Sequence, residues 1–231
     1  MLVNLVAFEP IPIVQQLDGN MRKISDFSYL PDEYPGPRPS SSFLIFGENV
    51  FPVSMTNGQL HVEEFGDLNK FLSDRGFKSI NQRQAVLAYG SNANPVDLAL
   101  SASSGKSLRH PIIAFKCQLF DFATVLCKGA RSRDRAIPAT LIERIGTSEN
   151  HFVLLLDPRD LPILDEKEGF FKDRNETESW YVRKPFHGKL IIPEIEWENG
   201  IEYYVGNRPE RNPKVGQVPT PMRNPSIIDC F

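Results

Sequence analysis

Short apolar segments recur along the chain from residue 84 onward, and each has about the length of a β-strand. They are rich in β-branched and aromatic residues and are bounded by Gly, Pro, Asn or Asp, a pattern that is typical of strands in a mixed sheet or barrel. The segments are AVLAY, IIAFKCQLFDF, IPATLI, HFVLLL, WYVRKPF, KLII and IEYYV. This pattern predicts the strands of an α+β domain.

Two helices are expected among these strands. The first should begin after Asn94, because Asn can cap a helix, Pro95 suits the first helical position, and Asp97 complements the positive end of the helix. The second should begin at residues 157–160, where the sequence DPRD offers the same signals, and should end near Gly169.

The first eighty residues have a different pattern. Residues 28–42 carry four prolines and several serines, which predicts an extended loop on the surface. Asn57 and Gly58 lie between two apolar segments and predict the tight turn of a β-hairpin. Asp67 can then cap a short helix that ends at Gly76.

These patterns divide the chain into three parts. We expect residues 1–80 to form a loop-rich extension with a hairpin and a short helix, and residues 81–208 to form the α+β domain. Residues 209–231 are rich in proline and have little apolar periodicity, so they form either a strap over the domain or a disordered tail.

Composition and charge narrow the class of partner. The chain has 231 residues, 41% of them hydrophobic, which is enough to bury a core. Its formal net charge of -3 gives no overall attraction to phosphate backbones or anionic lipid, so neither nucleic acid nor a membrane is expected as a partner. The three cysteines lack the spacing of metal or redox motifs, and the apolar N-terminal segment lacks the basic flank of a signal peptide. We therefore expect a cytoplasmic protein that acts on a small molecule.

The first candidate site is the turn at the end of the strand Leu87–Tyr89. Backbone N–H groups of Gly90, Ser91 and Asn92 can converge there on an anion or a carbonyl oxygen, close to the start of a helix. An ordinary strand-to-helix connection explains the same residues. The turn alone therefore does not decide between the two interpretations.

The second candidate site is the acidic end of the second helix, with the sequence LDEKEG. Helix C-termini are electrically negative, and both this potential and neighbouring acids raise the pKa of a carboxyl group. A carboxyl group of that kind suits general acid/base catalysis near neutral pH. Glu168 lies against Gly169, where the chain turns, and is the candidate. Asp165 and Glu166 are expected to be solvated carboxylates.

Taken together and in this order, the two motifs resemble those of the γ-glutamylcyclotransferases. In that family a strand that ends in Y-G-S-N is followed by several strands and then by L-D-x-x-E-G, and residues 89–92 and 164–169 match both motifs. Between them, residues 136–140 (AIPAT) resemble the Ile-Ala-Thr strand that lines the family's pocket, with Pro138 as an insertion or substitution. The resemblance covers a little over half of the chain.

The resemblance implies a fold and a site. The fold would be a small closed mixed β-barrel with flanking helices and a central cavity, to which the first eighty residues add their hairpin and helix. Glu168 would be the catalytic general acid/base. The substrate-binding residues implied are Tyr89, Gly90, Ser91, Asn92, Ala139 and Thr140.

The family's reaction cyclises a γ-glutamyl amide to 5-oxoproline and releases an amine or amino acid, so the resemblance implies a lyase or acyl-transfer enzyme. The α-amino group of the substrate attacks its own γ-carbonyl carbon, and one carboxylate can carry the protons. No metal or organic cofactor is implied, and the four histidines have no ligand spacing.

Two departures from the family pattern keep an alternative open. A polar segment, residues 170–179 (FFKDRNETES), separates the E-G pair from Trp180, and the long N-terminal extension lies outside the common core. Because a fold does not fix a function, the alternative is a non-catalytic small-ligand-binding or assembly module on the same fold.

The basic residues of the segment 128–135 are expected to lie in a solvated loop, or to place one Arg against a substrate carboxylate. The sequence does not predict the oligomeric state.

Overall fold

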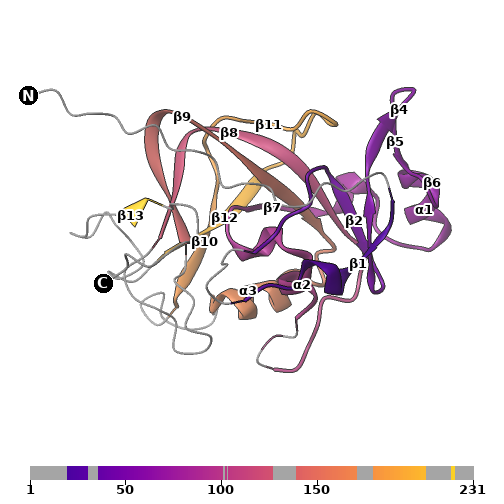
Figure 1. Ribbon diagram of the computed structural model, residues 1–231, viewed down its shortest axis with the longest axis horizontal. Helices are drawn as coiled ribbons and strands as arrows, with labels where there is room; N and C mark the ends of the chain where they lie inside the picture. The colour runs from indigo at the N-terminus through magenta and orange to yellow at the C-terminus, as the bar shows by residue number, and fades with distance from the viewer. Residues whose placement is uncertain are drawn as a thin grey trace, which may run out of the picture.

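The computed structural model of the chain describes residues 20–30, 36–100, 102, 104–126, 139–170, 179–206 and 220–221. Within these residues the fold is mixed α+β, with one large sheet and few helices (Figure 1). Its strands are β1 (Arg22–Lys23), β2 (Phe43–Phe46), β3 (Asn49–Pro52), β4 (Ser54–Thr56), β5 (Gln59–Val62), β6 (Gly66–Asp67), β7 (Gln84–Ala88), β8 (Ile112–Leu126), β9 (Ala139–Leu156), β10 (Tyr181–Pro185), β11 (Leu190–Ile191), β12 (Ile201–Gly206) and β13 (Thr220–Pro221). Its helices are η1 (Ile24–Phe27), α1 (Leu68–Asp74), η3 (Ile80–Gln82), η4 (Ser91–Ala93), α2 (Pro95–Ala99) and α3 (Leu161–Glu168).

The large sheet has ten strands in the described part of the chain. Eight of them follow the order β1-β3-β2-β8-β9-β7-β12-β10, and β11 and β13 also pair with β8. The pairing of β7 with β12 is parallel, whereas β8 pairs antiparallel with β9 and β2. A separate sheet of three strands consists of β4, β5 and β6.

The long hairpin of β8 and β9 bends the sheet. These strands have 15 and 18 residues, and their register shifts between Phe120 and Phe122, where Asp121 has a φ angle of 60°. Between these two pairs β8 has only Asp121, whereas β9 has residues 144–147, so the extra residues lie on β9. Extra residues in one strand of a pair bend that strand and increase its twist. The bend brings the first residues of β9 toward β12 and β10 (Figure 1).

The sheet is nevertheless not closed, so the expected closed barrel is wrong. Where β9 meets β12, the amide of Gly206 donates to the side-chain oxygen of Thr140 at 3.3 Å. Where β9 meets β10, the Tyr181 hydroxyl donates to the carbonyl of Ala139 at 2.8 Å. A closed barrel would need a backbone ladder at this place, and these contacts each use a side chain instead.

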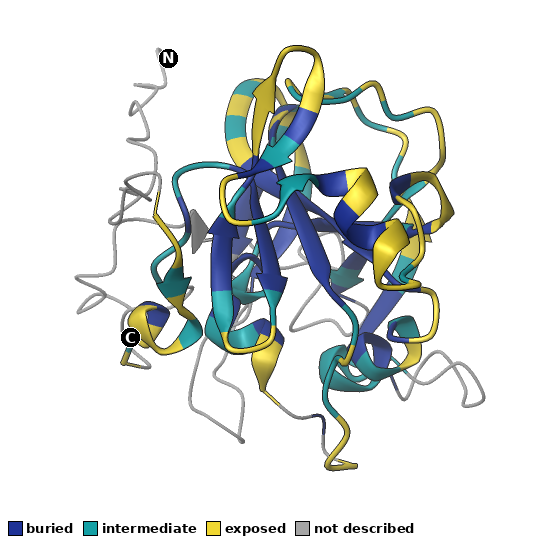
Figure 2. Ribbon diagram, turned by 90° about the vertical axis from the view of Figure 1, so that its right-hand side faces the viewer, coloured by how far each residue is buried: buried dark blue, intermediate teal, exposed yellow. Residues whose placement is uncertain are grey.

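Side chains alternate between the two faces of the central strands. Leu87 and Val153 lie in one buried apolar cluster, whereas their neighbours Val86 and Leu154 lie in the other. Figure 2 shows the central strands as the most buried part of the molecule. Buried side chains from η1, α2 and α3 complete the second cluster, namely Phe27, Leu98 and Leu164.

Local sequence signals predicted several elements well. Asn94 caps α2, since its Oδ1 accepts from the amides of Val96 at 2.8 Å and Asp97 at 3.3 Å. Asp67 caps α1 by accepting from Lys70. The predicted hairpin turn joins β4 and β5, and both of its central residues have positive φ angles. These three predictions are confirmed.

Other element boundaries differ from the expected ones. Helix α3 begins at Leu161, just after the expected start at residues 157–160, because the Asp157 carboxylate accepts from the amide of Arg159 at 3.0 Å and holds a turn that precedes the helix. The segments IPATLI and HFVLLL were predicted as two strands. Their described residues, 139–142 and 151–156, belong to the single strand β9, because Glu143 and residues 148–150 between them still pair with β8.

The N-terminal extension contributes strands to the large sheet. Leu44 of β2 lies opposite Ile113 of β8, so the sheet continues across the predicted boundary at residue 81. Ser42 and Pro39 are buried, which contradicts the expected surface position of this part of the proline-rich segment. The division of the chain into an extension of residues 1–80 and a domain that begins at residue 81 stays a prediction. Among the described residues, no helix combines the length and apolar character that crossing a bilayer requires.

A buried histidine lies in the hairpin of β8 and β9. The Nε2 atom of His151 is 2.9 Å from Glu149 Oε2 and 3.2 Å from Thr124 Oγ1. Burial lowers the pKa of His151, although the Glu149 carboxylate acts in the opposite direction. Burial alone would raise the pKa of Glu149, but the hydrogen bonds from His151 and Thr124 outweigh burial and lower it.

This arrangement predicts that the folded state loses stability as the pH falls. Below pH 6.5 an unfolded histidine binds a proton that the buried His151 does not, so protons favour the unfolded state until the folded pKa is passed. The lowered pKa of Glu149 affects the free energy of unfolding only at more acidic pH. We expect the free energy of unfolding to fall between pH 7.5 and 5.5 by up to about 1.4 kcal/mol more in the native chain than in His151→Gln. Urea titrations at both pH values measure the difference, and equal losses in both proteins would contradict it.

Candidate active site

The first candidate motif forms a tight turn at the end of β7. The amide of Ala93 donates to the carbonyl of Gly90 at 3.1 Å, and the amide of Asn94 donates to the carbonyl of Ser91 at 2.8 Å. These bonds make the 3-10 helix η4, which carries Asn92 at its centre. Ser91 and Asn92 are half-buried, so part of each residue is accessible to solvent.

Gly90 does not have the positive φ angle that favours glycine. Its φ angle is -106° and its ψ angle is -147°, so it lies outside the left-handed region. A glycine in this motif is therefore not explained by a positive φ angle. Gly169, at the end of α3, does have a positive φ angle of 68° and ends the helix as a left-handed cap.

The second candidate motif brings Glu168 to the turn. The Nδ2 atom of Asn92 donates to Oε1 of Glu168 at 3.0 Å, across a separation of 76 residues. Both side chains are half-buried. The two motifs therefore meet in space, with the carboxylate on the last residue of α3 and the amide on η4.

The neighbouring acids of α3 have different environments, and the expectation that Asp165 is solvated is wrong. Asp165 is buried, and its Oδ1 accepts from Arg183 Nε at 2.9 Å and from the hydroxyl of Tyr204 at 2.6 Å. Arg183 also pairs with Glu202. Burial and the Asp165 charge raise the pKa of Tyr204 well above its ordinary value, so this tyrosine stays protonated and donates to the carboxylate. Asp165 therefore stabilises the packing of α3 on the sheet.

Glu166 and Lys167 hold α3 to the segment that follows α2. Glu166 accepts from the amide of Ser104 at 2.6 Å and from its hydroxyl at 2.7 Å. The Nζ atom of Lys167 donates to the carbonyls of Asp97 and Leu98. Of the three acids in the motif, Glu168 is thus the one that faces the turn at Asn92.

Ala139 and Thr140 are buried at the start of β9, and their described hydrogen bonds serve the sheet. The carbonyl of Ala139 accepts from Tyr181, and Thr140 Oγ1 accepts from Gly206. Within the described residues, no hydrogen bond joins Ala139 or Thr140 to Glu168. Their assignment as substrate-binding residues stays a prediction. The basic segment 128–135 lies outside the described residues.

One residue of the site was missed by sequence reasoning. The Nη2 atom of Arg38, in the N-terminal extension, donates to the carbonyl of Tyr89 at 3.0 Å and to that of Gly90 at 3.3 Å. Arg38 is 51 residues from Tyr89, in a segment expected to be surface loop, and no local signal marks it. The Tyr89 hydroxyl in turn donates to the carbonyl of Tyr204, which holds β7 to β12.

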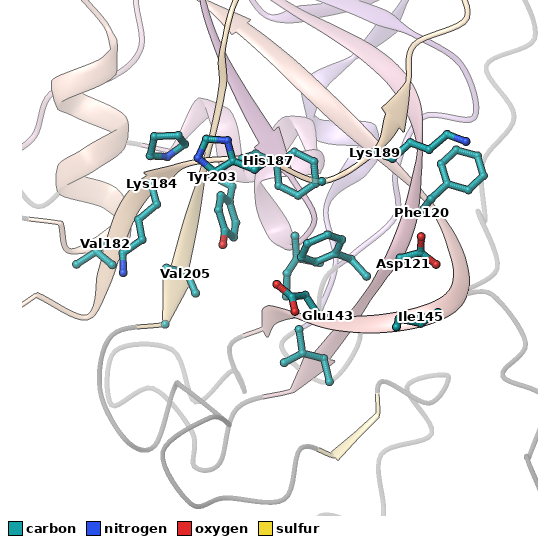
Figure 3. A pocket seen from close by; sticks show the side chains of 17 residues that line it. Phe120, Asp121, Glu143, Ile145, Val182, Lys184, His187, Lys189, Tyr203 and Val205 are labelled. Carbon is teal, nitrogen blue, oxygen red and sulfur yellow. The ribbon is translucent and has the colours of Figure 1, made fainter.

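A separate cavity of about 530 Å³ opens between the bend within the β8–β9 hairpin and the strands β10 and β12 (Figure 3). It is lined by four half-buried aromatic rings, those of Phe120, Phe122, Phe186 and Tyr203. Charged or titratable side chains also line it, namely Asp121, Glu143, Lys184, His187 and Lys189. Burial raises the pKa of Tyr203, and the Glu143 charge adds to the effect.

This cavity has a shape that depends on a glycine. A Cβ atom on Gly188 would lie 2.3 Å from Phe186 Cζ and 2.5 Å from Phe122 Cε2, so the two rings occupy the space of a side chain there. The lining includes neither Glu168 nor any residue of the turn 89–92. The cavity and the Asn92–Glu168 pair are therefore two distinct places where a ligand could bind. Among the described residues, no cluster of His, Cys, Asp and Glu could hold a metal ion.

Comparisons with known proteins find partial likenesses of fold. No protein-family model matches the sequence, and no curated protein matches it significantly. A solved structure described as a γ-glutamyl cyclotransferase matches at 21% identity over 52% of this chain and 64% of that chain, with a TM-score of 0.39. The crystal structure of an uncharacterized protein from Homo sapiens matches at 21% identity over 53% of this chain and 66% of that chain, with a TM-score of 0.38. Each match thus spans less than two thirds of the other chain, and neither assigns an activity to this one.

Proposed function

We propose that the Asn92–Glu168 pair is the reaction centre of a γ-glutamylcyclotransferase-like enzyme. The observation that carries the proposal is the 3.0 Å hydrogen bond between Asn92 Nδ2 and Glu168 Oε1. Two motifs that are far apart in the sequence meet through it, and they are the motifs in which the chain resembles that family. The proposed reaction converts a γ-glutamyl amide into 5-oxoproline and releases an amine or amino acid.

The chemistry needs one proton carrier. The α-amino nitrogen of the substrate forms a bond to the γ-carbonyl carbon, the bond from that carbon to the leaving nitrogen breaks, and one proton passes from the attacking to the leaving nitrogen. Glu168 would accept this proton as a carboxylate and return it as a carboxylic acid. The nucleophile belongs to the substrate, so the mechanism uses no nucleophile from the protein.

Asn92 and the turn would position the reactants. An amide side chain does not ionise near neutral pH and so cannot act as the acid or base, but Asn92 would fix the orientation of the Glu168 carboxylate through its hydrogen bond. We further propose that the backbone amides of residues 90–92 hold the carboxylate of the glutamyl group or the developing oxyanion. Holding the substrate in a folded-back conformation would supply part of the rate acceleration through proximity.

A product assay tests the proposed function. The purified chain is incubated with a panel of γ-glutamyl amino acids, γ-glutamylamines and glutathione, and 5-oxoproline is measured. We expect 5-oxoproline to form from at least one member of the panel, in equal amount to the released amine or amino acid. Its absence across the panel would contradict the proposal, because the panel covers each class of leaving group.

The aromatic cavity supports a second candidate function, a non-catalytic small-ligand-binding module. Its volume of about 530 Å³ lies in the range of small-molecule sites, and it combines aromatic walls with charged side chains. Binding of a panel compound without 5-oxoproline formation would favour this second function. Binding is measured by calorimetry on the same protein preparation, so that the two functions are compared directly.

A further inference from the structure

We propose that Arg38 is a positioning residue for the Asn92–Glu168 site, so that the N-terminal extension is part of the active unit. The activity part of this inference rests on the proposed function. Its structural part concerns only the turn at residues 89–94 and can be tested on its own. Nothing in the resemblance to the γ-glutamylcyclotransferases assigns a role to the extension.

The contacts of Arg38 fall on the residues that begin the turn. Its guanidinium donates to the carbonyls of Tyr89 and Gly90, the last residues before η4. The carbonyl of Gly90 also accepts the first hydrogen bond of η4, from the amide of Ala93. Arg38 therefore holds the carbonyl that starts the turn, and Asn92 lies two residues further along the same turn.

The segment that carries Arg38 is fixed next to it on the α2 side. The Nδ2 atom of Asn94 donates to the carbonyl of Pro37 at 2.7 Å and to that of Phe27 at 2.9 Å, while its Oδ1 caps α2. The hydroxyl of Tyr29 donates to Asp97 Oδ2 at 2.7 Å. One buried asparagine thus joins the start of α2 to two separate places in the extension.

The same segment is also fixed on the other side, by β8. Ser42 Oγ accepts from the amide of Lys116 at 2.8 Å, and the Lys116 ammonium donates to the carbonyl of Ser40 at 2.9 Å. Ser42 itself is fully buried. Arg38 therefore extends from a backbone segment that is held at both ends, which is what a residue needs if it is to fix the position of another segment.

An arginine suits this place better than a lysine. Both bonds come from Nη2, whose two N–H groups are held in fixed directions by the planar guanidinium, whereas an ammonium group is a compact charge on a flexible stem. A displacement of about 1 Å in a reacting group can reduce a rate by about 100-fold. Loss of the Arg38 bonds should therefore lower kcat through the position of Asn92 and Glu168.

The test compares Arg38→Met and Arg38→Lys with the native full-length chain. Arg109→Met is the control, since Arg109 is an exposed arginine whose side chain contacts none of the residues 89–94 in the described structure. Amide hydrogen exchange at Ala93 and Asn94 reports on the turn directly. We expect exchange there to be at least tenfold faster in both Arg38 variants and unchanged in Arg109→Met. Native exchange rates in Arg38→Lys, which retains the charge, would overturn the proposal whether or not Arg38→Met folds.

The activity readout is kcat for 5-oxoproline formation. We expect kcat to fall about 10- to 100-fold in Arg38→Met, with little rescue by lysine and with a smaller change in KM. Full rescue by lysine would show that the charge alone matters and would contradict a positioning role. If the native chain forms no 5-oxoproline, the proposed function fails, and the exchange rates at Ala93 and Asn94 still decide the role of Arg38.

Discussion

Glu168→Gln is expected to abolish turnover while the fold and the binding of substrate stay close to native. Glutamine has nearly the same shape and can still accept the hydrogen bond from Asn92, but it cannot carry a proton. General acid/base catalysis contributes roughly 10² to 10⁴ in rate, or about 3 to 5 kcal/mol of transition-state stabilisation. The loss should appear in kcat, measured by 5-oxoproline formation, with circular dichroism unchanged. A decrease of less than about tenfold would exclude Glu168 as the proton carrier.

Glu166→Gln is the matched control for this prediction. The residue lies on the same helix two positions earlier, and its carboxylate accepts hydrogen bonds from Ser104 rather than from the turn. We expect its kcat to change by less than about tenfold, well below the effect of removing a general acid/base. If Glu166→Gln is inactive and Glu168→Gln is active, the catalytic glutamate of the family motif corresponds to Glu166, and its assignment to Glu168 is wrong by two positions.

Of the substitutions considered, Asp165→Ala is expected to lower the free energy of unfolding most. Asp165 and Arg183 are about 10% exposed, and the same carboxylate accepts from Tyr204. Removing one partner of a buried ion pair leaves an uncompensated charge and typically costs about 3 to 5 kcal/mol. We expect a decrease of that size in the free energy of unfolding, measured by urea titration and reduced somewhat because Glu202 still pairs with Arg183.

An exposed ion pair supplies the comparison for Asp165. Asp74 pairs with Lys70 one helical turn away on α1, and both side chains are more than half exposed. Asp74→Ala should therefore change the free energy of unfolding by less than about 1 kcal/mol. Equal effects of Asp74→Ala and Asp165→Ala would contradict the buried network around Arg183.

Local elements of the fold could be predicted from the sequence because neighbouring residues determine them. Asn94 and Asp67 cap their helices as expected, and the turn at Asn57 forms the expected hairpin. The joining of two predicted strands into β9 depends instead on pairing with β8, which local patterns do not show. The open sheet likewise depends on contacts between β9 and β12 that use Thr140 as a side-chain acceptor.

The sequence predicted the candidate site only at residues that belong to the two family motifs. The order and spacing of the two motifs placed Glu168 with the turn 89–92, and the bond to Asn92 agrees with that prediction. The burial of Asp165 was not predictable, because it depends on a pairing with Arg183, 18 residues further along the chain on β10, that no local pattern shows. Arg38 was missed because its two acceptors are backbone carbonyls, which have no sequence signature.

A crystal structure of Glu168→Gln with a γ-glutamyl amide tests the central claim most directly. An inactive variant would retain the uncleaved compound, so its electron density reports where the substrate binds. We expect the scissile nitrogen within hydrogen-bond distance of the residue 168 side chain and the glutamyl carboxylate at the amides of residues 90–92. Density in the aromatic cavity beside Tyr203, with none at Asn92, would contradict the claim and would favour the ligand-binding function.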